Sequence, residues 1–137
     1  MADFVIKAAI SDPDADTFIL PNQKTMYGGK GVEVGDRVFV FASESDEGNG
    51  LIAEGEIASV KATPKKSGVP RQTPRVSVAI RVLRRAKTTL GRDQLKRFSD
   101  WSDGKPETEL NFKFYRQATN KLCGITHETA RFLDKFF

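Results

Sequence analysis

The sequence has very few of the residues that form disulfides and zinc sites. Cys123 is the only cysteine and His127 the only histidine in 137 residues. A single cysteine excludes an internal disulfide, the usual pattern in a reducing cytoplasm. One cysteine and one histidine also leave too few ligands for a zinc site of the His and Cys type. We therefore expect a cytoplasmic protein that carries no metal and no cofactor.

Long apolar runs are also lacking. The apolar stretches are only a few residues long, far short of the roughly 20 that a membrane-spanning helix needs. The opening MADFVIKAAISDPDAD has no basic n-region and soon becomes acidic, so we expect no signal peptide. Hydrophobic residues make up 39% of the chain and charged residues 29%. This composition predicts a single folded domain over residues 1–137 that makes no contact with a membrane.

Acidic residues are absent from one long stretch. Between Lys61 and Arg92 the chain has ten basic residues and no acid, whereas residues 1–60 carry a net charge of −7 and residues 93–137 one of +1. The overall charge of +4 therefore conceals one strongly basic segment. Clustered Lys and Arg side chains attract polyanions such as nucleic acid. The same pattern also fits an ordinary solvated loop and strand face.

Several segments have the composition and spacing of β-strands. The strand over 75–83 is the clearest, because apolar residues alternate from Val76 to Val82 with positions on the opposite face. Residues 17–20 fit either a short strand or a turn before Pro21, and the aromatic-rich segment 111–117 is expected as a further strand. The other predicted strands cover residues 4–10, 37–42 and 51–60.

Between these strands the sequence predicts a loop and short helices. Residues 61–74 contain three prolines, which favours an exposed basic loop. One or two helical turns are expected over 91–98, and a helix in 125–137 with Thr126 as its N-cap. Many short strands, few helices and no βαβ alternation predict an α+β domain. Its centre would be a small, strongly bent mixed β-barrel with two or three short helices.

Three of these strands resemble the EVE domain of the PUA-like superfamily. The matching segments are V-G-D-R-V-F-V-F-A at 34–42, G-L-I-A-E-G-E-I-A-S-V at 50–60 and R-V-S-V-A-I-R-V at 75–82. The chain resembles an atypical member, because its first strand has Phe4 and no tryptophan nearby. The resemblance implies a PUA-like barrel that binds RNA or DNA, often with a modified base in an aromatic pocket.

Together, the basic segment and the resemblance nominate residues for a nucleic-acid site. We expect the phosphate backbone of the nucleic acid to be contacted by Lys65, Lys66, Arg71, Arg84, Arg85 and Arg116. For an extruded base we expect a pocket built by Tyr27, Trp101, Gln117 and Asn120, since aromatic rings stack on bases and amides read base edges. For Trp101 the alternative is a ring that folds back to cap the core.

Two other classes of function stay open. A small enzyme acting on a nucleotide or another small molecule would need two carboxylates in one cleft, and Asp36, Glu54 and Glu56 are the candidates. A protein-interaction module would instead expose the aromatic stripe of Phe132, Phe136 and Phe137. The sequence names no catalytic residue, because His127 has no evident partner.

Overall fold

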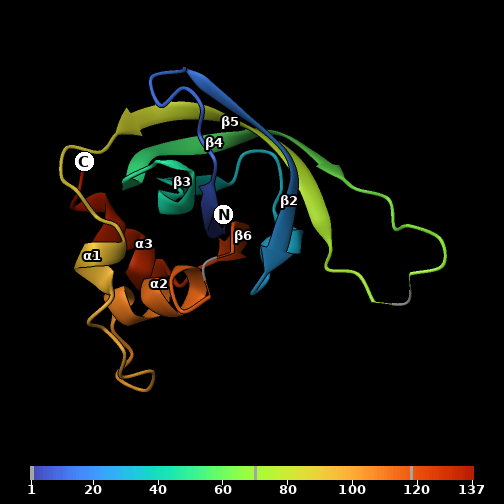
Figure 1. Ribbon diagram of the computed structural model, residues 1–137. Coiled ribbons are helices and arrows are strands. Elements are labelled where there is room, and N and C mark those ends of the chain that lie inside the picture. The colour runs from blue at the N-terminus through green and yellow to red at the C-terminus, as the bar shows by residue number, and fades with distance from the viewer. Residues whose placement is uncertain (1, 70, 118) are drawn as a thin grey trace.

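The strands of the chain close into a six-stranded barrel, seen in a computed structural model that describes residues 2–69, 71–117 and 119–137 (Figure 1). Around the barrel the order is β1-β3-β4-β5-β2-β6. β1 pairs in parallel with β3, and β2 with β6, while the remaining pairs are antiparallel. The predicted mixed barrel is therefore confirmed. The strands are β1 Asp3–Ala8, β2 Thr17–Met26, β3 Arg37–Ala42, β4 Gly50–Ala62, β5 Arg75–Arg85 and β6 Lys121–Gly124.

Short helices gather on one side of this barrel (Figure 1). The α-helices are α1 Arg92–Leu95, α2 Pro106–Phe114 and α3 His127–Asp134, and the 3-10 turns are η1 Gly29–Gly31 and η2 Glu44–Asp46. The Thr126 side chain accepts a hydrogen bond from Thr129 N and so caps α3, as its sequence position predicts. In the part of the chain that the structure describes, no helix is long and apolar enough to cross a membrane.

Two apolar cores explain why several strands lack a polar face. In β1, Phe4 and Ile6 point into the barrel, whereas Val5 packs with Phe39 in a second core between the barrel and the helices. A strand that is buried on both faces reads as a continuous apolar run and loses its alternation. β5 has only its inner face buried along most of its length, and this is why its alternation was visible in the sequence.

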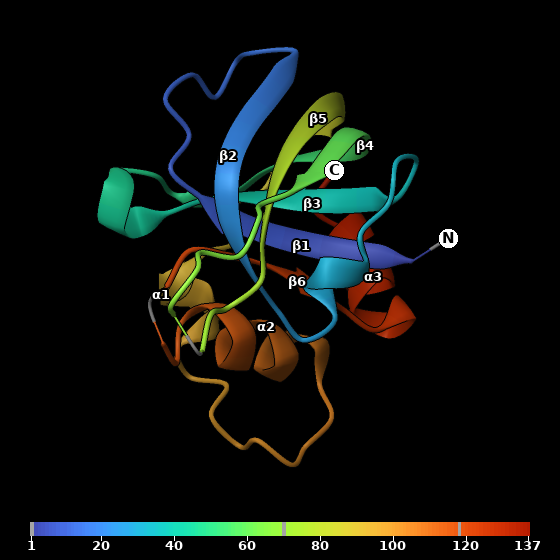
Figure 2. The same cartoon turned by 90° about the vertical axis from the view of Figure 1, so that its right-hand side faces the viewer.

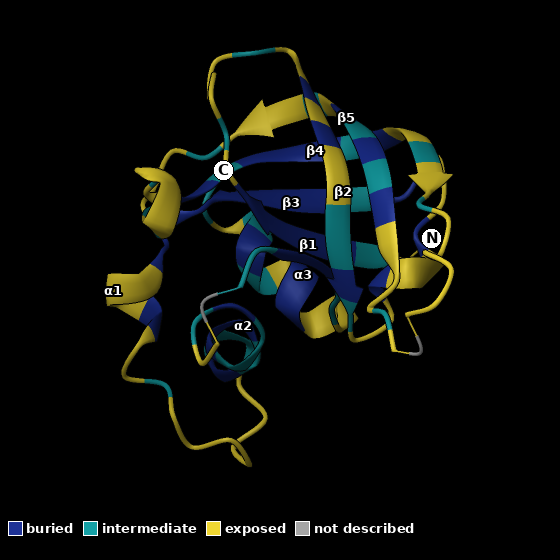
Figure 3. Ribbon diagram, turned by 45° about the vertical axis from the view of Figure 1, so that its right-hand side comes forward, coloured by how far each residue is buried: buried dark blue, intermediate teal, exposed yellow. Residues whose placement is uncertain are grey.

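β4 and β5 continue beyond the barrel as a hairpin. Their last pair joins Ala62 to Val76, and residues 63–74 connect them. This connection extends away from β2 (Figure 1), and most of its residues are exposed (Figure 3). The exposed loop predicted at 61–74 is present, except that β4 includes its first two residues.

The strand predicted over 111–117 is wrong, because most of this segment belongs to α2. Pro106 occupies the first helical turn with Glu107 and Glu109, a pattern that favours a helix start. Leu110 and Phe114, four residues apart, are buried against the second core. The strand in this region is β6, which begins only at Lys121, and residues 17–20 form part of the ten-residue strand β2.

Candidate nucleic-acid interface

The exposed end of the hairpin carries half of the basic segment. We call the described residues 61–69 and 71–75 the basic arm. In the described part of the chain, the ion pairs include none formed by Lys61, Lys65, Lys66 or Arg71. The arm therefore presents uncompensated positive charge to solvent.

A glutamine side chain holds the arm in shape. Gln72 Nε2 donates to the carbonyl oxygens of Lys66 at 2.7 Å and Val69 at 3.2 Å, and Gln72 Oε1 accepts from Lys66 N at 3.0 Å. At the base of the arm, Thr63 N donates to Arg75 O at 2.9 Å. These bonds satisfy backbone groups that have no strand partner, so the arm keeps a defined turn despite its exposure.

The arm is also fastened to β2, where the pairing with β5 is irregular. Between Leu20 and Gln23 the register shifts, and Asn22 in this bulge has a φ of 53°. Asn22 Oδ1 accepts a hydrogen bond from Thr63 Oγ1, and its carbonyl accepts one from the Arg75 guanidinium, both at 2.9 Å. The bulge thus fixes the direction in which the arm leaves the barrel.

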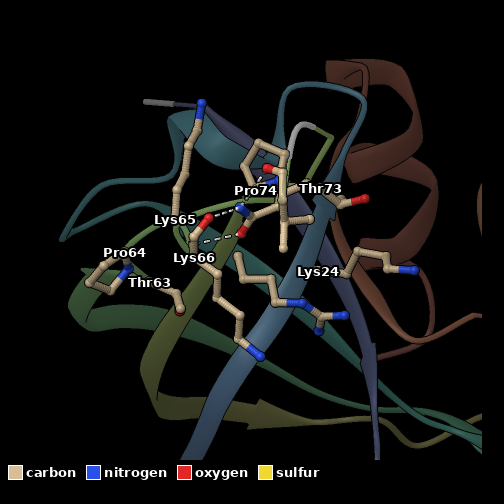
Figure 4. A pocket seen from close by; sticks show the side chains of 10 residues that line it. Lys24, Thr63, Pro64, Lys65, Lys66, Thr73 and Pro74 are labelled. Atoms are coloured by element: carbon tan, nitrogen blue, oxygen red, sulfur yellow. Dashed lines mark hydrogen bonds between the residues drawn. The ribbon is translucent and has the colours of Figure 1, made fainter.

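Between the arm and β2 lies a basic hollow of about 400 Å³ (Figure 4). Lys24, Lys65, Lys66 and Arg75 contribute to its lining, which contains no acidic residue. The three lysine side chains fan outward around it, and those of Lys65 and Lys66 point to opposite sides of the arm. This arrangement attracts anions from several directions.

A second hollow of about 330 Å³ shares Lys24 and Arg75 with the first and adds Asn120. Its lining also contains no acidic residue. We call the two together the arm groove. The groove runs from the arm across β2 toward the segment that follows α2, and the arm, β2 and α2 are all visible from the side shown in Figure 2.

Two of the arginines predicted to contact the nucleic-acid backbone bind groups of the protein itself. Arg84 forms ion pairs at 2.6 Å with Glu54 Oε1 and with Asp134 Oδ1. Arg85 donates to the carbonyl oxygens of Pro13, Asp14 and Ala15 at 2.6–2.9 Å. Lys65, Lys66 and Arg71, by contrast, lie together in the arm. The basic segment therefore divides into a free part and a part that holds the barrel together.

An aromatic cluster brings together two of the four residues predicted for a base pocket. Phe112, on α2, lies between Tyr27 and Trp101, with ring centroids 5.9 and 5.5 Å away. The Arg116 guanidinium stacks on it from 4.5 Å. Tyr27 and Trp101 are 43% and 46% exposed, so their rings are available to a ligand. We call these four residues the aromatic patch.

Backbone geometry, one ion pair and one hydrogen bond position the patch. Tyr27 has a φ of 51° and directly precedes Gly28 at 84°, so a left-handed turn presents the tyrosine ring. Lys113 Nζ lies 5.4 Å from the centre of that ring. It also donates to Glu109 Oε2 and to Gly124 O, both at 2.7 Å, which ties α2 to β6.

The two amides predicted for the base pocket follow α2. Gln117 is exposed, and its carbonyl accepts a hydrogen bond from Lys121 Nζ at 3.3 Å. Asn120 lines the arm groove and donates to Asp46 Oδ2 at 3.2 Å. The segment that carries them therefore lies between the arm groove and the aromatic patch. Phe112 was missed because it was assigned to a strand, although its spacing from Arg116 suits one face of a helix.

Two buried lysines hold the end of α2, a role that the sequence does not indicate because lysine is rarely buried. Lys7 and Lys121 pair across β1 and β6, and each is 1% exposed. Lys7 Nζ donates to Phe114 O at 2.7 Å, so both lysines satisfy carbonyls at or just beyond the C-terminal end of α2. Burial, together with the charge of Lys121, lowers the pKa of Lys7 to about 8.

The three carboxylates considered for an enzyme each bind a group of the fold. Asp36 accepts a hydrogen bond from Glu33 N at 2.8 Å and so closes a turn. Buried Glu54 pairs with Arg37 and Arg84, and Glu56 pairs with Arg81. Among the described residues, no three His, Cys, Asp or Glu side chains come together as a metal site.

The C-terminal aromatic stripe packs against the barrel. Phe132, Phe136 and Phe137 are partly buried on the second core. Phe137 contacts Phe39 with 5.9 Å between ring centroids, and the Arg84 guanidinium lies 4.6 Å from its ring. The exposure that an interaction surface would need is therefore largely lost to packing within the domain.

Comparison with solved structures shows that proteins of low sequence identity share this fold over nearly the whole chain, which agrees with the small mixed barrel that the sequence predicted. No protein-family model matches the sequence, and no curated protein matches it. Human THYN1 in complex with DNA containing 5-methylcytosine is similar, with a TM-score of 0.67, 16% identity and coverage of 97% of this chain and 95% of that one. The DUF55 domain of human thymocyte nuclear protein 1 has a TM-score of 0.65, 14% identity and 96% coverage of both chains. An ASCH mutant protein from Zymomonas mobilis has a TM-score of 0.54, 11% identity and 98% coverage of both chains.

Proposed function

We propose that this protein binds nucleic acid, with the backbone in the arm groove and an unpaired or extruded base on the aromatic patch. One observation carries the proposal. A groove lined by four cations and no carboxylate leads, through Asn120 and the segment after α2, toward two exposed aromatic rings. Phosphates and bases are the two chemical groups that such a surface suits.

The backbone part of the proposal rests on Lys24, Lys65, Lys66, Arg71 and Arg75. Each phosphate that a cation neutralises releases counterions, so affinity falls with salt in proportion to the number of contacts. Arg84 and Arg85 contribute less in this proposal, because two carboxylates neutralise Arg84 and Arg85 donates to three backbone carbonyls. Arg75 donates to one carbonyl only and has no carboxylate partner among the ion pairs of the described residues. Arg116 would support the base, because it is stacked beside the aromatic rings.

The base part of the proposal rests on Tyr27 and Trp101, with the Gln117 and Asn120 amides available for the edge of the base. A base stacked on an aromatic ring contributes about 1–3 kcal/mol. Human THYN1 was solved with DNA that contains 5-methylcytosine. This supports a modified pyrimidine as the ligand to try first, since a methyl group adds apolar area to the stacked base.

Fluorescence anisotropy across a salt series tests the backbone part. The probes are labelled single-stranded and duplex oligonucleotides of DNA and RNA, with cytosine or 5-methylcytosine. We expect the double variant Lys65→Ala, Lys66→Ala to lower the slope of log K against log salt by about 2. The matched control replaces Lys96 and Lys135, two exposed lysines outside the groove, and keeps the wild-type slope. Failure of every oligonucleotide to bind, or equal slopes for the two double variants, contradicts the proposal.

The variant Trp101→Ala tests the base part. We expect it to weaken binding about tenfold and to leave the salt slope unchanged, because it removes a stacking partner and no charge. Equal affinity for the variant and the wild type contradicts a role for the aromatic patch.

A further inference from the structure

We propose that the basic arm enters the major groove of B-form DNA, with Val69 next to its turn touching the C5-methyl groups of pyrimidines. This inference rests on the proposed function and adds to it the form of nucleic acid and the contact that reads it. The observations that carry it are the shape of the arm, the placement of its charges on two sides and the exposed apolar side chain next to its turn.

The arm has the dimensions of a groove-entering ribbon. From the last pair, Ala62 with Val76, each side of the connection has about six residues, which span at most about 20 Å when extended. The major groove of B-DNA is about 12 Å wide and 8.5 Å deep and accepts a two-stranded ribbon, whereas the minor groove is about 6 Å wide. Bracing by Gln72 and anchoring on Asn22 preserve the shape of the arm, so little ordering is needed on binding.

The charges suit a channel that has a phosphate row on each side. Lys65 and Lys66 point to opposite sides of the arm (Figure 4). Arg71 lies on the returning side of the connection, and the ion pairs of the described residues include none for these three side chains. A duplex groove is bordered by two phosphate backbones, whereas a single strand offers only one. Double-stranded nucleic acid therefore fits this distribution better.

Next to the turn at residues 67–68, the arm carries an exposed apolar side chain, Val69, which also borders the arm groove. Val69 is 47% exposed, and its carbonyl oxygen accepts a hydrogen bond from Gln72. On the floor of the major groove, the C5-methyl group of thymine or 5-methylcytosine is the apolar feature that such a side chain can contact. The major groove of A-form RNA is too deep and narrow for side chains to read, so the arm selects DNA.

Anisotropy with four probes of one sequence tests the inference: a DNA duplex, the same duplex with uracil in place of thymine, the RNA duplex, and single-stranded DNA. We expect the wild type to bind the thymine duplex about fourfold tighter than the uracil duplex, the effect of burying one methyl group. The RNA duplex should bind at least tenfold more weakly than the DNA duplex.

Val69→Ser, an exposed substitution that leaves the arm charges in place, should bind thymine and uracil duplexes equally. Thr73→Ser is the matched control on the same arm and should keep the fourfold preference. Equal binding of DNA and RNA duplexes by the wild type, or a thymine preference that survives in Val69→Ser, overturns the inference while the proposed function stands. If none of the four probes binds, the proposed function fails and the inference fails with it.

Discussion

Replacing Lys7 with Met should change how stability depends on pH. In the folded chain the Lys7 ammonium is buried beneath α2, where it donates to Phe114 O and lies 4.9 Å from the centre of the Tyr115 ring. Its pKa is lowered from 10.5 to about 8 by burial and by the charge of Lys121. At pH values between about 8 and 10.5, the unfolded chain still holds a proton on Lys7 that the folded chain has released. The stability of the wild type therefore rises with pH over this range.

The size of the effect follows from the two pKa values. Each pKa unit corresponds to 1.36 kcal/mol, and linkage between pH 7 and pH 10 gives about 2–3 kcal/mol of added wild-type stability. The Met side chain does not titrate, so the variant lacks this gain. The free energy of unfolding of Lys7→Met, relative to that of the wild type, should therefore be highest at pH 7, where the wild type must bury a charge. It should be lowest at pH 10.

Urea unfolding followed by circular dichroism, at pH steps from 7 to 10, measures the free energy of unfolding of both chains. Burial and Glu44 raise the pKa of Tyr115, but both chains share this group, so it largely cancels in the difference. Lys96→Met, at an exposed position, is the control and should run parallel to the wild type. Parallel curves for Lys7→Met and the wild type would refute the assignment of a buried, titrating ammonium.

Three further substitutions test other parts of the fold. Glu54→Gln should lower the free energy of unfolding by about 2 kcal/mol, because it removes the buried negative charge between two arginines. Glu56→Gln, in a more exposed ion pair, should lower it by less than about 1 kcal/mol. Equal losses for the two variants in urea unfolding would contradict this. Gly29→Ala should destabilise by about 2 kcal/mol or more, because its Cβ would clash with Leu122 O, and Gly31→Ala, with open space around it, should be nearly neutral. Thermal melts that match for both variants would argue against the close contact. Thr126→Ala should cost about 1 kcal/mol by removing the cap of α3, measured by thermal unfolding, and an unchanged midpoint would contradict that role.

The barrel could be predicted from the sequence because most of its strands have a recognisable local pattern of residues. The alternation along β5 reflects one buried and one exposed face, and the Gly-Asp turn before β3 marks where that strand begins. β6 was missed because it is only four residues long and starts with Lys121, which is buried where β6 pairs with β1 at the other end of the sequence. Local pattern contains no information about such long-range partners.

The kinds of residue in the candidate site could be predicted from the sequence, but their positions relative to one another could not. The charge asymmetry identified the arm, but a count of cations cannot distinguish Lys66, which is free, from Arg84, which bridges two carboxylates. That distinction depends on pairings between β4, β5 and α3. Trp101 was predicted as a ring that could stack on a base, whereas its aromatic partner Phe112 is placed beside it only by the helix over residues 106–114.

The position of β6 in the barrel sets the order in which the chain can fold during synthesis. β6 pairs with β1, which is made first, and with β2, so four residues near the C-terminal end of the chain close the sheet. Until the ribosome has released residue 124, both strands keep an unpaired edge, the kind of surface on which partly made chains associate. Truncations upstream of β6 would leave the β1 and β2 edges unpaired, so they should aggregate rather than fold into a smaller barrel.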